Sequence, residues 1–145
     1  MTRTREATTL WFERALRPGP HWWVAALGVA VAIFWLSSLP ALEMFTPGPP
    51  EGLLNAVFKK TAHVLMYGAL AVGLHRAFSL RPRTWPFALL IALLYGISDE
   101  WHQSFVPGRE PAARDVAFDV LGASLALWLH QRVVESTAGP RSPAA

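Results

Sequence analysis

Side chains that could carry out acid–base chemistry gather in the stretch YGISDEWHQSFVPGREPAARD, at residues 95–115. It combines two adjacent carboxyl groups with an imidazole, and the imidazole of histidine has an unperturbed pKa near neutrality. Carboxylate and imidazole groups held together can serve as general acid and general base. A second histidine precedes this stretch, at the start of an earlier apolar run. The candidate catalytic residues are Asp99, Glu100, His102 and His63.

The same four side chains could instead ligate a divalent metal ion. Carboxylate oxygens and imidazole nitrogens suit Zn, Mn or Fe. Their spacing, however, matches no standard zinc motif such as His-Glu-x-x-His. A metal cofactor is therefore an alternative that the sequence leaves open.

A binding role is a further interpretation. Arg109 and Lys60 could hold an anionic head group, because a guanidinium group suits phosphate or carboxylate oxygens in a bidentate fashion. The segment FVPGR predicts a tight turn, with Pro107 and Gly108 present for backbone reasons, that directs Arg109 back toward the acids. The candidate ligand-binding residues are Lys60, Tyr67, Gln103, Arg109, Asp115 and Asp119.

A structural interpretation accounts for the same groups as a network of ion pairs and hydrogen bonds that ties helix ends together. Buried charges are normally paired, and Lys60 would then pair with Asp115 or Asp119. Ser37 and Ser38 could add hydroxyl groups, although serine in a membrane helix more often packs or caps. The sequence leaves open whether the cluster is a functional site or a structural clasp, that is, a network that holds the helix ends together.

The composition favours a membrane protein. Apolar residues make up 52% of the 145, and the mean hydropathy of +0.28 is high for a soluble domain. The formal net charge is +3, but the basic residues are spread along the chain, so nucleic-acid binding is not expected. The chain has no cysteine, which excludes disulfides, a thiol nucleophile and thiolate metal sites.

Four apolar runs predict an all-α fold, an integral membrane bundle of four transmembrane helices. The first run, WWVAALGVAVAIFWLSSL, carries no charge and exceeds the usual core of a signal peptide, so we expect a retained helix. The second is entered through a helical turn that begins near Glu51. The four predicted spans are residues 22–39, 61–80, 84–98 and 116–134.

The flanking segments predict three divisions of the chain: an N-terminal segment at 1–20, the helical domain at 21–134 and a disordered tail at 135–145. TTLWFERAL in the first segment has an apolar face at helical spacing and predicts a short interfacial helix. SSLPALEMFTPGPPEG predicts a loop, because its prolines cannot continue a helix. Three histidines, expected to be ordinary surface residues, are His21, His75 and His130.

The distribution of lysine and arginine predicts how these spans are oriented. Nine of the thirteen lie in segments on one side of the four spans and four on the other. The positive-inside rule therefore places both termini in the cytoplasm. At the opposite, outer face three polar segments converge: the start of the second span, the connection 99–114 and the start of the fourth span.

Helical spacing adds detail to this outer cluster. Lys60, His63 and Tyr67 stand at i, i+3 and i+7 and share one face of the second span. Asp115 and Asp119 share a face of the fourth with Gly122, whose small size lets a neighbouring helix approach closely. An acid inside a span costs about 2.5–3.5 kcal/mol, so Asp119 is expected to point into the bundle and find a partner there.

The block YGISDEWHQSFVPGREPAARDVAFDVLGA closely resembles the signature of VanZ-like membrane proteins: an acidic pair, His-Gln, Phe-x-Pro-Gly-Arg, an Asp, and a Gly on the next helix. KKTAHVLMYGAL resembles that family's Asp-Lys-x-x-His-x-x-x-Tyr segment, and FWLSSLP resembles the end of its first span. Lys59 stands where the family commonly has Asp, and Asp119 where it commonly has Asn. A metal-ligand assignment taken from the family therefore does not transfer at these two positions.

The resemblance implies a small helical bundle of the bacterial envelope, whose namesake is associated with low-level teicoplanin resistance. Two classes of function follow as expectations. In the first, an outward-facing polar pocket engages an amphiphilic ligand: a lipid head group, a lipid-linked wall precursor or a lipoglycopeptide antibiotic. In the second, the protein is a non-catalytic scaffold or accessory subunit. A transporter is less favoured, since four spans would need a homo-oligomer and the third span has no polar residue in its middle.

Overall fold

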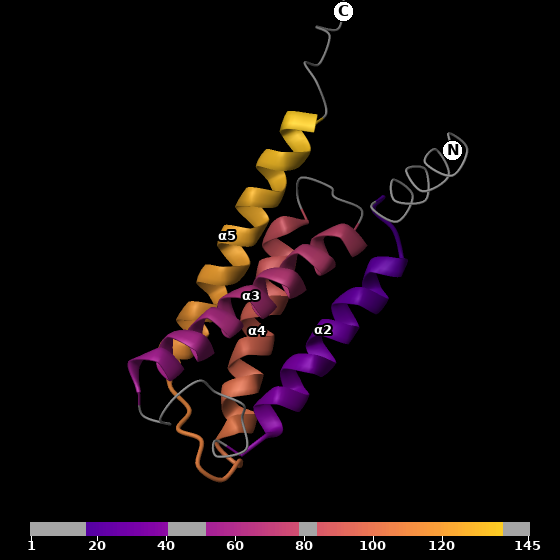
Figure 1. Cartoon of the computed structure of the whole chain (residues 1–145). Coiled ribbons are helices and arrows are strands. Elements are labelled where there is room, and N and C mark those ends of the chain that lie inside the picture. Colours follow the sequence, from indigo (N-terminus) through magenta and orange to yellow (C-terminus); the bar gives the residue numbers. More distant parts are fainter. Residues whose placement is uncertain (1–16, 41–51, 79–83, 138–145) are drawn as a thin grey trace, which may run out of the picture.

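The computed structural model describes residues 17–40, 52–78 and 84–137, and within these ranges the chain forms four helices and no strand. The all-helical prediction is confirmed. Figure 1 shows the four helices side by side, with α3 crossing the bundle obliquely. The helices are α2 (His21–Ser38), α3 (Leu53–Ala77), α4 (Trp85–Gln103) and α5 (Ala113–Thr137).

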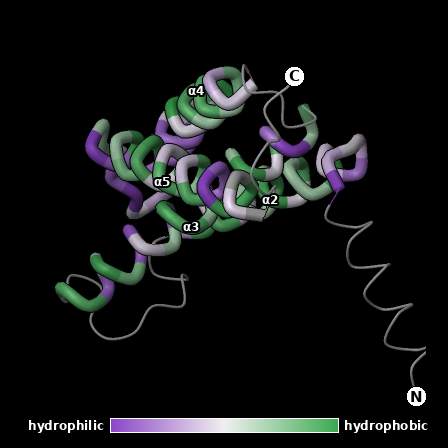
Figure 2. The backbone as a smooth tube through the Cα atoms, turned by 90° about the horizontal axis from the view of Figure 1, so that it is seen from above, coloured by the Kyte–Doolittle hydropathy of each residue, from purple (hydrophilic) through white to green (hydrophobic). Residues whose placement is uncertain are grey.

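Successive helices alternate in direction, so that α2 and α4 run parallel to each other and antiparallel to α3 and α5 (Figure 1). The central helix is α3, which contacts each of the other three, whereas α2 and α5 do not touch. Seen from above, α3 lies between α2 and α5 (Figure 2). The residues at which α2 and α4 end and α3 and α5 begin therefore meet at one end of the bundle, which we call the polar end.

Several helix boundaries differ from the prediction. The fourth helix, α5, extends three residues beyond the predicted span 116–134 at each end, so residues 135–137 of the predicted disordered tail are helical. The second helix is continuous from Leu53, so the turn expected near Glu51 is the first part of α3 itself. The third was predicted to stop at Ser98, with the acids in the following loop, but α4 continues to Gln103. The prediction was wrong because an apolar run measures the length of a span, whereas a helix continues until a breaker such as Pro107 ends it.

Small residues bring the helices close together. A Cβ atom added to Gly122 of α5 would lie 2.6 Å from the Cα atom of Val64 on α3, and one added to Gly68 would lie 3.0 Å from the Cβ atom of Ala126. Gly73 of α3 similarly faces the backbone of α2. The buried apolar core is otherwise dominated by alanines and by five larger side chains, Ile33, Tyr67, Leu70, Leu74 and Leu127. Such close contacts between small residues are typical of helix pairs in membranes.

The outer surface of the bundle is strongly apolar. Val24 is 74% exposed and Leu27 65% on α2, and α3, α4 and α5 also expose large aliphatic and aromatic side chains. Among the described residues, one helix, α2, is long and apolar enough to cross a membrane by length and composition. The apolar surface and this helix agree with the membrane character expected from the sequence.

One expectation about the opposite end of the bundle was wrong. His75, predicted to be an ordinary surface histidine, is only 3% exposed, and its Nδ1 atom lies 3.1 Å from the Thr84 hydroxyl oxygen. Its ring also meets the ring of His130, which is partly buried. The error arose because both residues were placed by their distance along a span, which says nothing about whether a residue faces the neighbouring helix.

Several predictions fall outside the described residues. They are the interfacial helix at 8–16, most of the loop at 37–52 and most of the tail at 135–145.

Candidate functional site at the polar end

Two polar contacts join α3 to α5 at the polar end. Lys60 forms an ion pair with Asp115, as the structural interpretation of the sequence predicted. One turn further along, Nδ1 of His63 lies 2.8 Å from Oδ1 of Asp119. The faces predicted from helical spacing are therefore confirmed, because residues three or four apart on α3 meet residues four apart on α5.

Asp119 is the most deeply buried acid of the cluster, with 1% of its surface exposed. Its second oxygen, Oδ2, packs against Gly96 of α4, where an added Cβ atom would lie 3.2 Å away. The same added atom would lie 3.5 Å from the ring of Tyr67. Gly96 thus provides the room in which the carboxylate of Asp119 and the phenol of Tyr67 lie next to each other.

The last two turns of α4 carry two further buried acids. Oδ2 of Asp99 accepts a hydrogen bond of 3.0 Å from the side chain of Gln103, four residues on. Oε2 of Glu100 accepts a hydrogen bond of 2.7 Å from the backbone N–H of Ala112, just before α5 begins. Glu100 lies two residues beyond the predicted span 84–98. Burial raises the pKa of its carboxyl group, and the hydrogen bond from the Ala112 N–H opposes that rise.

His102 connects α4 to α2. Its Nε2 atom lies 3.0 Å from the hydroxyl oxygen of Ser38, and that hydroxyl donates its own hydrogen to the Phe34 carbonyl oxygen at 2.7 Å. Since the Ser38 hydrogen is already used, His102 must be the donor, which places a proton on Nε2. The ring of His102 also stacks on Phe34, with centroids 4.4 Å apart. Ser38 thus joins the cluster, as the sequence suggested it could.

Arg109 follows a tight turn at which Gly108 adopts a positive φ of 75°, a conformation that favours glycine. The turn was predicted, but the prediction that it directs Arg109 toward the acids was wrong. Its guanidinium donates to the carbonyl oxygens of Leu39 at 3.1 Å and Leu36 at 2.9 Å, and not to a carboxylate. The last carbonyl groups of α2 have no partner within their own helix, and a cation at a helix C-terminus satisfies them. Burial lowers the pKa of Arg109, and Asp99 and Glu100 partly offset that effect.

Four buried oxygen atoms at the polar end have no hydrogen-bond partner in the described part of the chain. A buried polar atom without a partner costs about 1–3 kcal/mol, so these oxygens are chemically suited to a ligand that donates hydrogen bonds. The positive charges nearby are already engaged, with Lys60 on Asp115 and Arg109 on backbone carbonyls. The four oxygens are Tyr67 Oη, Asp99 Oδ1, Glu100 Oε1 and Asp119 Oδ2.

The predicted site residues thus meet at one end of the bundle, but they are divided between two places. His63, Lys60, Asp115 and Asp119 lie in the seam between α3 and α5. Asp99 and His102 lie toward α2 instead. Across residues 17–40, 52–78 and 84–137, no three histidine, cysteine or acidic side chains are grouped as a metal site requires.

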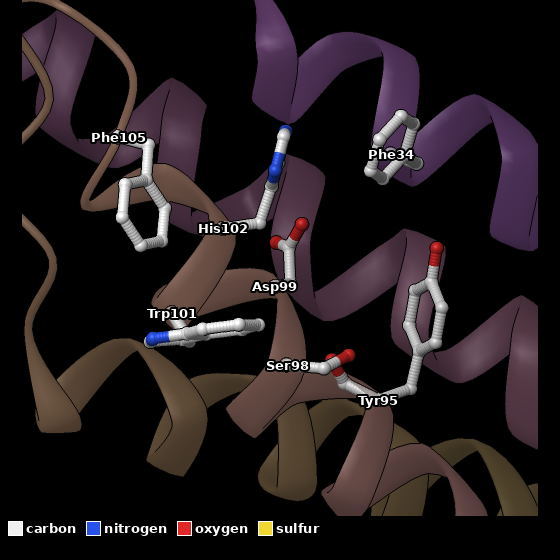
Figure 3. A pocket seen from close by; sticks show the side chains of 7 residues that line it. All are labelled: Phe34, Tyr95, Ser98, Asp99, Trp101, His102 and Phe105. Atoms are coloured by element: carbon white, nitrogen blue, oxygen red, sulfur yellow. The ribbon is translucent and has the colours of Figure 1, made fainter.

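A groove of about 360 Å³ opens between α2 and α4 beside the second of these places. Figure 3 shows Asp99, His102 and Tyr95 extending from α4 toward α2, from which Phe34 reaches back. The remaining wall is largely aromatic. The lining residues are Phe34, Tyr95, Ser98, Asp99, Trp101, His102 and Phe105.

Sequence reasoning missed the aromatic and glycine members of the site. Phe34 belongs to an apolar run in which nothing distinguishes it from its neighbours, and Gly96 resembles any small residue of a membrane helix. Tyr95 carried a weak signal, since it is one of only two tyrosines in the chain and opens the polar block. In the structure its hydroxyl group donates to the Ala30 carbonyl oxygen at 2.7 Å.

Comparison with known proteins gave one match. A protein-family model described as VanZ/LLP1 matches residues 21–134, more than half of the chain. No curated protein and no solved structure matches the sequence.

Proposed function

Because the chain belongs to the VanZ/LLP1 family, we propose that it is a four-span membrane protein of the bacterial cell envelope whose polar end faces outward and binds an amphiphilic ligand. The ligand is a lipid head group, a lipid-linked wall precursor or a lipoglycopeptide antibiotic. Binding of this kind would let the protein contribute to teicoplanin resistance. The single observation that carries the proposal is the groove between α2 and α4, where polar groups and aromatic rings open onto an apolar surface.

The placement of polar and apolar side chains supports the membrane part of the proposal. Asp119 is buried in the interior, whereas each helix exposes aliphatic side chains outward, for example Leu65 at 65%, Leu94 at 57% and Leu121 at 57%. In water this arrangement would leave a large apolar surface exposed, while in a bilayer it places apolar groups against lipid and acids against protein. The distribution of lysine and arginine supports an outward-facing polar end with both termini inside.

The geometry favours binding over a reaction. The His63–Asp119 pair, which has the composition of a general base with its orienting carboxylate, lies in the seam between α3 and α5, whereas His102, in the groove, is paired with the Ser38 hydroxyl. What the polar end offers a ligand is a set of hydrogen-bond acceptors beside a groove. We therefore place the function in recognition of an amphiphile.

A second candidate function, a membrane scaffold or accessory subunit, rests on a different observation. The Lys60–Asp115 and His63–Asp119 contacts join α3 to α5 and would be useful for cohesion alone. Arg109 likewise ties the connection before α5 to the end of α2. These contacts account for the seam between α3 and α5, but they do not account for the aromatic groove.

The test compares variants in cells and in detergent. We expect His102→Ala to remain folded and expressed while cells that carry it lose the teicoplanin phenotype of the wild type. Glu110→Gln is the matched control, because Glu110 lies in the connection between α4 and α5, is exposed and is not among the residues that line the groove. Arg109→Ala should instead reduce protein abundance, since it leaves the α2 carbonyl groups without a donor. If the phenotype of every variant follows abundance alone, the scaffold function is correct and the binding function is wrong.

A further inference from the structure

We propose that the seam between α2 and α4 is a lipid-binding groove that takes one acyl chain along its inner part and an ammonium head group at its polar end. The proposal deepens the function proposed above, on which it rests, by naming the chemical class of the ligand. The occupant is a membrane lipid whose head group carries a primary ammonium.

The head-group part of the groove combines a carboxylate with aromatic rings. Asp99 is 4% exposed, and its Oδ1 atom has no hydrogen-bond partner in the described part of the chain. Phe34, Tyr95 and Trp101 line the same groove (Figure 3). A cation lying over aromatic faces next to a carboxylate is the arrangement by which proteins recognise ammonium groups.

The charges around this part of the groove do not favour an anionic group as the part of the ligand that is recognised. Lys60 is paired with Asp115 and Arg109 is held by the carbonyl groups of α2, while the other two cations of the polar end, Lys59 and Arg114, are not among the residues that line this groove. His102 donates its Nε2 hydrogen to Ser38, so when the ring is neutral its other nitrogen is an acceptor. In the described part of the chain, the groove therefore offers a ligand one buried acceptor without a partner, Asp99 Oδ1, beside the exposed indole of Trp101, whose N–H is a donor.

A second groove, of about 170 Å³, lies further along α2 and α4, has an entirely apolar wall and is also lined by Leu70 and Leu74 of α3. The two share Tyr95, and Ala30, to which Tyr95 is hydrogen-bonded, lines the apolar part. From Phe34 to Trp23 the seam follows α2 for roughly 16 Å, at 1.5 Å per residue. That length is close to half of the bilayer's hydrocarbon core, about 15 Å, which is the depth that one acyl chain fills.

The experiment uses the full chain in a non-ionic detergent and two single-chain probes with the same acyl group, lysophosphatidylethanolamine and lysophosphatidylglycerol. Binding of each is measured by native mass spectrometry. We expect the wild type to bind the ethanolamine probe about tenfold more tightly, because the probes share the chain and the phosphate and differ in the ammonium. Equal affinity for the two probes would overturn the proposal.

Two pairs of variants locate the two parts of the ligand. Asp99→Asn should abolish the preference for the ethanolamine probe and leave glycerol-probe binding nearly unchanged, whereas Glu110→Gln should change neither. Ala30→Leu fills the apolar groove and should weaken both probes about tenfold, whereas Ala25→Leu, on the exposed face of the same helix, should weaken neither. Retained preference in Asp99→Asn, or equal effects of the two leucine variants, would contradict the proposed groove.

Failure of this inference and failure of the proposed function have different signatures. If the wild type binds both probes equally and Ala30→Leu still weakens them, the groove binds amphiphiles and only the ammonium specificity is wrong. If neither probe is bound by the wild type, the lipid groove is wrong, and the teicoplanin phenotype of His102→Ala then decides independently whether the polar end binds another ligand.

Discussion

The seam between α3 and α5 and the seam between α2 and α4 are built differently. Between α3 and α5 the backbones approach so closely at Gly122 that no side chain fits, and the Lys60–Asp115 and His63–Asp119 contacts close the end of the seam. Between α2 and α4 the contact is sparser, two grooves run along it, and the polar groups include acceptors without partners. The comparison indicates that one polar cluster is divided into a clasp on α3–α5, where polar contacts join the two helices, and the groove on α2–α4 that we propose as the binding site.

Breaking the clasp at its most buried pair should have the largest effect on stability. His63→Ala leaves Asp119 without its partner in a site that is 1% exposed, and we expect a loss of about 3 kcal/mol. The melting temperature in detergent should fall by roughly 10 °C. Lys60→Ala is the matched control, because its ion pair is partly exposed and should contribute about 1 kcal/mol or less. Equal melting temperatures for the two variants would contradict the assignment of His63 to the clasp.

Widening the close contact between α3 and α5 should lower the free energy of unfolding somewhat less than His63→Ala does. In Gly122→Ala the new methyl group meets the backbone of Val64 on α3, which cannot move aside as a side chain can, so we expect a loss of about 2 kcal/mol. Gly28→Ala on α2 meets nothing within 4 Å and should be neutral or slightly stabilising, since alanine favours helix over glycine. Thermal unfolding of both variants in detergent checks the contrast, and a Gly122→Ala protein as stable as the wild type would show that the seam is loose.

The clasp could be predicted from the sequence and the groove could not, for a physical reason. Helical spacing alone places Lys60 and His63 on one face of α3. It likewise places Asp115 and Asp119 on one face of α5, and the two faces are expected to meet because a buried charge without a partner is costly. The groove depends on how far α2 and α4 are rotated and separated, which no periodicity within either helix reports. Arg109 shows the same limit, because its acceptors are backbone carbonyl groups at the end of α2, and which carbonyl groups lie within its reach depends on how α2 packs in the bundle.

Altering the groove should affect function more than stability. His102→Ala removes a hydrogen bond to Ser38 and a stacked contact with Phe34, which together should cost about 1 kcal/mol. The expected melting temperature is therefore well above that of His63→Ala, while the teicoplanin phenotype is lost. Measuring both variants in one strain tests the division directly. If His102→Ala unfolds as readily as His63→Ala, the α2–α4 seam is part of the clasp.

The smallest effect on the melting temperature is expected from Glu100, which lies where the two seams meet. Burial raises the pKa of this side chain above its ordinary value of 4.5, so the folded protein binds the proton more tightly than the unfolded chain does. The stability that this proton contributes is fully present below the ordinary pKa and is lost as the pH rises through the folded pKa. The melting temperature of the wild type should accordingly fall as the pH is raised from about 4 toward neutrality.

Glu100→Gln isolates this effect, because the amide resembles the protonated acid in shape and cannot ionise. Asp115, His63 and Asp119 also act electrostatically on Glu100, so the informative quantity is the difference in melting temperature between wild type and variant at each pH. We expect no difference near pH 4 and a growing advantage of the variant at higher pH. A difference independent of pH would mean that folding does not shift the pKa of Glu100, and would contradict the desolvation of its carboxyl group.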